Sequence, residues 1–291
     1  MGALKMSRGM CAAAILMASA SAALAQDVAV DAAIQAKVPQ AVSATGKVVN
    51  AAFPNVPYTI PQESGVTGAG VELAAAIGQV LGLPTEQSVI ANTAAARVGV
   101  QSGRYNFAMG PIIDTAEVEK ELDVIPWTKT SPGFLYRAEE TRNDVLEFCG
   151  VKFGIVSGSI PAERNMEALT KACAAAGKPE QEVAGYSDQN AMILALEAGR
   201  ADAVLMTSAA AAYAASVRGD RLKAFMAESD IFGVGQFSGV VLKKGEPLSE
   251  VVLEAMQKLQ ADGVYDRIME KYNLTGLRVE KMQLNPMTKA N

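Results

Sequence analysis

Short β-strand patterns alternate with amphipathic helical patterns along most of this chain. Residues 152–156 read as a strand, residues 157–159 as a turn, and Pro161 opens a helix, because proline favours the first helical turn. A helix over residues 191–198 then leads through a turn into a strand over residues 203–206. Strands that alternate with helices predict an α/β fold built on parallel sheets.

Composition sets the size of the fold and excludes several kinds of site. The chain has 291 residues, of which 50% are hydrophobic and 20% charged, enough for one large domain or two lobes. It contains no histidine, which excludes Ser-His-Asp and Cys-His nucleophile systems and most zinc sites. No basic stripe interleaved with aromatics occurs, so nucleic acid is not an expected partner. We expect no metal and no cofactor.

The first 25 residues have the layout of a signal peptide. Lys5 and Arg8 precede an apolar run, and Ala23-Leu24-Ala25 forms an A-x-A-like cleavage site before Gln26. The alternative is a buried N-terminal helix. The sequence therefore predicts a signal peptide over residues 1–25 and export of the mature chain. Removing its two basic residues leaves 26 − 2 = 24 basic against 31 acidic side chains, a net charge of −7.

Two cysteines remain once the predicted signal peptide is removed. They are Cys149 and Cys173, whereas Cys11 precedes the apolar run and so does not suit a lipid anchor. An even pair in an exported chain favours one disulfide bond. The alternative is two buried free thiols.

Four segments resemble, in order, a known family. The first is a Gly-rich loop with its helix (residues 65–74), and the second is a turn with a basic and an aromatic residue (residues 101–105). The third is a helix-turn-strand (residues 196–204), and the fourth is a C-terminal helix (residues 261–272). The set is similar to the bacterial extracellular solute-binding proteins of family 3, which bind polar amino acids for ABC importers. The resemblance spans roughly residues 46–275, and Cys149 and Cys173 also look like a cysteine pair found in part of that family.

The resemblance implies a two-lobed type II periplasmic binding protein fold. Two α/β lobes would be joined by two crossover strands and would close on a ligand by hinge motion. Lobe 1 is expected over residues 45–131 plus 239–275, and lobe 2 over residues 132–238. Residues 26–44 form an N-terminal lead-in and residues 276–291 a C-terminal tail.

The family's charged ligand contacts are missing at the matching positions. The Thr-x-Glu-Arg run, whose Arg clamps the ligand α-carboxylate, ends here in Val118. The hydrogen-bonding Ser/Thr position is Ile113, the preceding small polar position is Pro111, and the acidic position that pairs with the α-ammonium is Thr207. Because a buried unpaired carboxylate or ammonium is costly, a standard α-amino acid is not the predicted ligand.

Other residues are expected to form the pocket by their place in the resemblance. The predicted ligand contacts are Asn55, Tyr58, Gly110, Trp127, Ser157, Ser159 and Thr207. Arg97 or Lys129 could replace the lost clamp. The alternatives are that Trp127 packs at the edge of a lobe and that Lys129 is solvated.

We therefore expect a periplasmic solute-binding protein that is not an enzyme. It would act as a monomer and deliver a small organic ligand to an inner-membrane ABC permease. One alternative is a periplasmic accessory or sensory protein with a degenerate site. Another is an enzyme that resembles cyclohexadienyl dehydratases, for which Glu163 is the candidate general acid.

Overall fold

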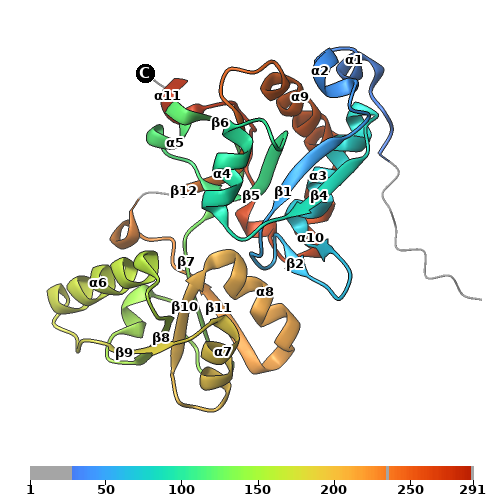
Figure 1. The fold of residues 1–291 in the computed structure, drawn as a ribbon. Coiled ribbons are helices and arrows are strands. Elements are labelled where there is room, and N and C mark those ends of the chain that lie inside the picture. The colour runs from blue at the N-terminus through green and yellow to red at the C-terminus, as the bar shows by residue number, and fades with distance from the viewer. Residues whose placement is uncertain (1–27, 234–235, 290–291) are drawn as a thin grey trace, which may run out of the picture.

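The computed structural model describes residues 28–233 and 236–289 as two α/β lobes, shown one above the other in Figure 1. Each lobe is built around one five-stranded sheet. The predicted signal peptide lies outside the described residues. Within the described part of the chain, no helix is long and apolar enough to cross a membrane.

The sheet of lobe 1 has the order β4-β1-β5-β12-β6. Its strands are β1 (Val48–Ala52), β4 (Thr85–Val89), β5 (Phe107–Ile113), β6 (Leu122–Thr130) and β12 (Gln236–Lys243). Strand β1 is parallel to β4 and β5, whereas β12 is antiparallel to β5 and β6. A parallel core with antiparallel additions thus replaces the purely parallel sheet expected from the strand and helix alternation.

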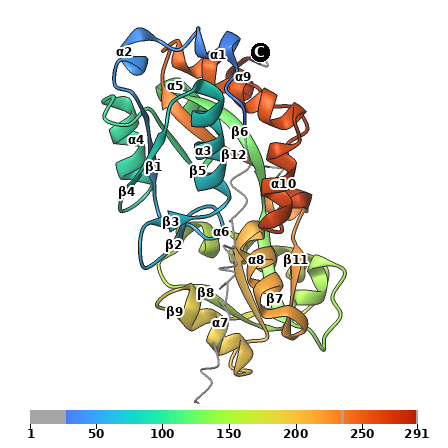
Figure 2. The ribbon, with the colours of Figure 1, turned by 90° about the vertical axis from the view of Figure 1, so that its right-hand side faces the viewer.

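Helices cover both faces of this sheet (Figures 1 and 2). They are α1 (Ala32–Gln35), α2 (Gln40–Ser43), α3 (Ala69–Leu81), α4 (Thr93–Gln101), α5 (Ala116–Glu121), α9 (Leu248–Ala261), α10 (Val264–Lys271) and α11 (Pro286–Lys289). The largest core cluster joins α3, α9 and α10 through residues such as Leu73, Met256 and Ile268. Gly263 separates α9 from α10 with a φ of 70°, a left-handed conformation that suits glycine. A small hairpin, β2 (Ile60–Pro61) and β3 (Val66–Thr67), precedes α3.

The sheet of lobe 2 has the order β11-β7-β10-β8-β9. Its elements are β7 (Pro132–Arg137), β8 (Lys152–Val156), β9 (Glu182–Tyr186), β10 (Ala203–Thr207), β11 (Leu222–Met226), α6 (Ile160–Ala175), α7 (Gln189–Glu197) and α8 (Ser208–Arg218), with short 3₁₀ turns at η1 (Val145–Phe148), η2 (Gly219–Arg221) and η3 (Asp230–Phe232). Strand β8 is parallel to β9 and β10, and β7 is antiparallel to β10 and β11. The predicted strands at 152–156 and 203–206 are confirmed.

Two adjacent crossover segments join the two lobes (Figure 2). The first lies at Ser131, between the end of β6 and the start of β7. The chain returns through β12, which pairs with β6 from Gln236 opposite Thr130 to Lys243 opposite Leu122. The two-lobed fold with two crossover strands is therefore confirmed.

The segment after η4 (Thr275–Leu277) packs on lobe 1 although the sequence suggested a tail. Met282 and Leu284 belong to the core of this lobe. The Asn285 side-chain amide donates to Asp123 Oδ1 at 2.7 Å. The backbone N–H groups of Met287 and Thr288 both donate to the Glu119 carboxylate.

A disulfide bond links Cys149 to Cys173 with an S–S distance of 2.03 Å. It ties the end of η1 to the last turn of α6, across the aromatic core of lobe 2. The predicted disulfide is therefore confirmed.

Candidate ligand-binding site

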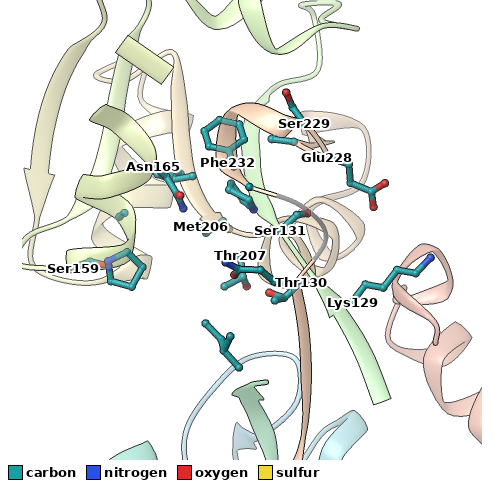
Figure 3. A pocket seen from close by; sticks show the side chains of 18 of the residues that line it. Lys129, Thr130, Ser131, Ser159, Asn165, Met206, Thr207, Glu228, Ser229 and Phe232 are labelled. Atoms are coloured by element: carbon teal, nitrogen blue, oxygen red, sulfur yellow. The ribbon is translucent and has the colours of Figure 1, made fainter. Parts of the chain in front are cut away.

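A cavity of about 620 Å³ lies where lobe 2 meets the crossovers. This volume is in the usual range for small-molecule sites. Figure 3 labels ten of the residues that line it: Lys129, Thr130, Ser131, Ser159, Asn165, Met206, Thr207, Glu228, Ser229 and Phe232.

Four parts of the chain bring these side chains together. The first crossover supplies Lys129 to Pro132, and the N-terminal half of α6 supplies Ser159 and Asn165. The junction of β10 and α8 supplies Met206 and Thr207, and the loop after β11 supplies residues 227–230, 232 and 233. Lobe 1 adds Ile113 from the end of β5. Because parallel strands of an α/β sheet end at one edge, loops and helix N-termini converge there.

The N-terminus of α6 faces the cavity with a reduced set of hydrogen-bond donors. Ser159 is its N-cap, and the Ser159 side chain makes no capping hydrogen bond. Pro161 follows in the first turn and also lines the cavity. Proline has no backbone N–H, so this helix end offers one donor fewer to an anion than an ordinary helix N-terminus.

Thr207 is placed at the N-terminus of α8. Its Oγ1 accepts a hydrogen bond from the backbone N–H of Ala210 at 3.2 Å and so caps the helix. The hydroxyl proton stays free to donate into the cavity that Thr207 lines. This position therefore supplies a neutral donor where the resemblance implied a carboxylate.

Three charged side chains line the cavity, and none is an arginine among the described residues. Lys129, Glu228 and Asp230 form no ion pair with any described residue. Figure 3 shows the Lys129 amine and the Glu228 carboxylate directed to one side, away from Ser159 and Asn165. The labelled lining residues on the side of Ser159 and Asn165 are neutral, whereas Asp230 adds a carboxylate from η3, which packs against α6.

The structure brings only part of the predicted contact set to the cavity. Ser159 and Thr207 line it, and so does Lys129. Trp127 is fully buried in the core of lobe 1, with Tyr265 Oη donating to its carbonyl oxygen at 2.8 Å. Trp127 is therefore a packing residue, because α10 covers this part of β6.

Tyr58 packs with Trp127 in the same core. Their ring centroids lie 5.3 Å apart in an edge-on arrangement. Tyr58 is 3% exposed, and its hydroxyl is 3.2 Å from Thr128 Oγ1. Burial raises the pKa of Tyr58 to about 12. Its hydroxyl is thus engaged inside lobe 1 and lies outside the cavity lining.

Three further predicted contacts lie outside the lining. A Cβ on Gly110 would come within 2.2 Å of the Phe53 ring, so this glycine admits close packing inside lobe 1. The Ser157 hydroxyl lies over Gly185 of β9, where a Cβ would approach it to 2.4 Å. Asn55 forms an isolated bridge with Thr59.

The position of the family's clamp arginine faces the interior. Val118 is 8% exposed and packs in the core cluster that contains Phe53 and Leu122. Arg97 does not replace the clamp, because it pairs with Glu121 at 2.6 Å and lies outside the cavity lining. Position 118, where the resemblance predicted the loss of the clamp arginine, therefore carries a side chain that packs in the apolar core.

Ser131, Asn165 and Phe232 line the cavity but were missed from the sequence. Asn165 lies one helical turn after Pro161, so the 3.6-residue period of α6 could have found it. Ser131 precedes Pro132 at a strand boundary, which marks a turn but no ligand contact. Phe232 lies in a loop with no periodic pattern.

One buried carboxyl group directly follows a cavity-lining residue in the sequence. Asp114 follows Ile113, is 6% exposed, and neither of its oxygens accepts a hydrogen bond from a described residue. Burial, followed by the charge of the nearby Glu119 carboxylate, raises the pKa of Asp114 to about 7. The pair therefore holds a proton over much of the acidic range.

Comparison with known proteins was made for both sequence and structure. The family model for bacterial extracellular solute-binding proteins, family 3, matches residues 48–275. The arginine-binding protein ArgT of Corynebacterium glutamicum is 25% identical over 249 residues, which cover 83% of this chain and 79% of that protein.

Solved structures share the fold. An ancestral cationic amino acid solute-binding protein, AncCDT-1, aligns with a TM-score of 0.66 and 20% identity over 80% of this chain and 98% of that chain. The amino acid ABC transporter protein AbpA from Streptococcus pneumoniae, bound to L-arginine, aligns with a TM-score of 0.60 and 23% identity over 83% and 100%. Since the family model spans most of the sequence, this chain belongs to the bacterial extracellular solute-binding proteins of family 3.

Proposed function

We propose that this protein captures a small uncharged organic solute in the periplasm and delivers it to an inner-membrane ABC permease. The observation that carries the proposal is a cavity lining with no arginine among the described residues and with a set of neutral side chains between α6 and the first crossover. There Ser159, Asn165 and Thr207 offer hydroxyl and amide groups, and Met206 and Phe232 offer apolar surface. Neutral hydrogen-bonding groups beside apolar walls suit a neutral solute, because they leave no buried charge uncompensated.

The lost carboxylate clamp supports the same proposal. Val118 packs in the core of lobe 1, and Pro161 removes a backbone donor from the N-terminus of α6. An α-carboxylate in this cavity would have Lys129 as its sole described cationic neighbour, on the side facing away from Ser159. A compact, strongly hydrated ammonium gives less specific recognition of a carboxylate than an arginine fork.

The enzyme alternative has less support. AncCDT-1 is described as a precursor of cyclohexadienyl dehydratase, but its similarity to this chain concerns the fold. Glu163, the general-acid candidate from the sequence, is exposed and lies outside the cavity lining. No observation therefore favours acid catalysis by Glu163.

A thermal-shift series tests the proposal with solutes that differ in charge. L-Arginine, L-glutamine and L-phenylalanine are compared with 2-phenylethanol and with the uncharged fraction of a bacterial metabolite extract. A solute at one hundred times its Kd stabilises the fold by about 2.7 kcal/mol, which raises Tm by roughly 5–10 °C for a chain of this size. We expect such a shift from the uncharged fraction and none from millimolar amino acids. A shift of that size with any of the three amino acids would refute the proposal, and no shift with any sample would favour the accessory alternative.

A further inference from the structure

Helix α8 is fixed to the sheet of lobe 2. One face of the helix, formed by Ala210, Ala211 and Ala214, lies in a core cluster of that lobe. Gly133 of β7 lets the helix approach closely, since a Cβ there would come within 2.8 Å of the Ala211 Cβ. Because the helix packs this tightly on β7, it moves with lobe 2 when the lobes rotate.

A second face of α8 packs against lobe 1. Ala209 is 2% exposed and belongs to the core cluster of lobe 1, and Tyr213 packs against the same cluster. The spacing of four residues places both side chains on one side of the helix. Figures 1 and 2 both show α8 beside α10 of lobe 1. Ala209, Tyr213 and the lobe 1 surface that they touch together form the α8 contact.

The two lobes stand in an open arrangement. Apart from residues of the strands β6 and β12, Ile113 is the one lobe 1 residue in the cavity lining among those that the structure describes. Its side chain is 43% exposed, so lobe 1 covers little of the cavity. Closure on a solute therefore requires a rotation about the crossovers.

The α8 contact lies across the crossovers from α6. In Figure 1, the start of β7 lies between α6, which lines the cavity, and the pair of helices α8 and α10. Ser208, the neighbour of Ala209, donates its N–H to the Ser131 carbonyl oxygen at 2.9 Å, which places the pivot next to the contact. Neither Ala209 nor Tyr213 lines the cavity. A rotation that brings lobe 1 towards α6 therefore moves it away from α8, as in a lever.

We propose that the α8 contact holds the two lobes open and so sets the affinity for the solute through the cost of closure. The packing of Ala209 and Tyr213 on lobe 1 buries apolar surface that closure exposes again. When the closed state is a minor population, the apparent affinity falls in proportion to that population. This inference goes beyond the proposed function, because it concerns lobe closure and does not depend on the class of solute.

Distance measurements between the lobes test the proposal without a ligand. Nitroxide labels are attached at two exposed positions, Glu117→Cys on α5 and Arg164→Cys on α6, in a chain that also carries Cys11→Ser. Both helices lie on the left in Figure 1. Cys149 and Cys173 are held in the disulfide and take no label. Any retained solute is removed by dialysis in urea and refolding, and double electron-electron resonance gives the distribution of distances between the labels.

Ala209→Leu is the informative variant, and Ala214→Leu is its matched control. A larger side chain at position 209 overpacks the contact only while the lobes are open, whereas Ala214, 6% exposed, packs inside lobe 2. We expect Ala209→Leu to raise the fraction of short distances at least about threefold over the natural sequence, and the control to leave it unchanged. An unchanged or longer distribution for Ala209→Leu, or an equal shift in the control, would overturn the proposal.

Tyr213→Ala tests the same contact by truncation, which keeps the proposal testable if the larger side chain prevents folding. The change removes a ring that packs on lobe 1 and leaves a good helix former in α8. Tyr186→Ala is the control, because Tyr186 is also half-buried but packs on the core of lobe 2. We expect more short distances with Tyr213→Ala and no change with Tyr186→Ala. An absent shift in Tyr213→Ala, or the same shift in both variants, would contradict the proposal. The identity of the solute does not enter these measurements, so they stand or fail independently of the proposed ligand class.

Discussion

Replacing Asp114 with asparagine should change how stability depends on pH. The folded protein raises the pKa of Asp114 from 3.8 to about 7, with burial as the main cause and Glu119 as the second. Because the folded pKa lies above the unfolded one, the folded chain holds a proton that the unfolded chain has released. The stability contribution is therefore fully present below pH 3.8 and is lost as the pH rises to about 7.

The size of the effect follows from the two pKa values. About three pKa units at 1.36 kcal/mol each correspond to about 4 kcal/mol in total. Roughly 3 kcal/mol of this falls between about pH 5 and about pH 8.5, and solvent screening lowers the expected change to about 1–3 kcal/mol. Asparagine keeps the shape of the side chain but does not titrate. The stability of Asp114→Asn relative to the natural protein should therefore rise by that amount between the two pH values.

Urea unfolding at both pH values measures this difference. Glu119→Gln is the control, because the Glu119 carboxylate accepts the N–H groups of Met287 at 2.9 Å and Thr288 at 2.6 Å. Hydrogen bonds to a charged group contribute about 1.5–3 kcal/mol, so this variant should lose stability at both pH values. The raised pKa of the buried Asp114 carboxyl group would be refuted by either of two results. One is that Asp114→Asn is less stable than the natural protein at about pH 8.5, and the other is that the stability difference does not change with pH.

Three further predictions concern the clamp position, the surface arginine and the disulfide. Val118→Arg should lower stability by about 3 kcal/mol or more in urea unfolding without creating affinity for L-arginine in calorimetry, because the new charge enters an apolar cluster; measurable L-arginine binding would contradict this. Arg97→Ala should leave solute binding unchanged in the thermal-shift series and change stability by less than about 1 kcal/mol, since its ion pair with Glu121 is on the surface; a lost solute shift would restore Arg97 as a ligand contact. Replacing both Cys149 and Cys173 with serine should lower the free energy of unfolding by about 3–4 kcal/mol, because the disulfide joins residues 24 positions apart and so restricts the unfolded chain. If reductant did not change the unfolding of the natural protein, the disulfide would not be stabilising.

The sequence predicted the architecture because local patterns and global topology agree in this fold. Strand and helix alternation and the cysteine pair each have a local signature. The places of Ser159 and Thr207 were also predictable, since each directly precedes a helix at the sheet edge where ligands bind in α/β folds.

The missed features depend on contacts between segments far apart in the chain. Trp127 lies near the crossover in sequence, yet α10 buries it through Tyr265, 138 residues away. The chain after residue 276 has no long periodic pattern, but Met282 and Leu284 fill the core of lobe 1. The place of Ser131 beside the cavity depends on its backbone contact with Ser208, 77 residues away.

Native mass spectrometry of protein purified without refolding tests the central claim most directly. The intact complex is recorded, the bound molecule is released in the gas phase, and its mass and fragmentation give its identity. The account predicts a retained solute that carries no α-carboxylate and no α-ammonium group. A retained standard α-amino acid, in particular L-arginine, would contradict it.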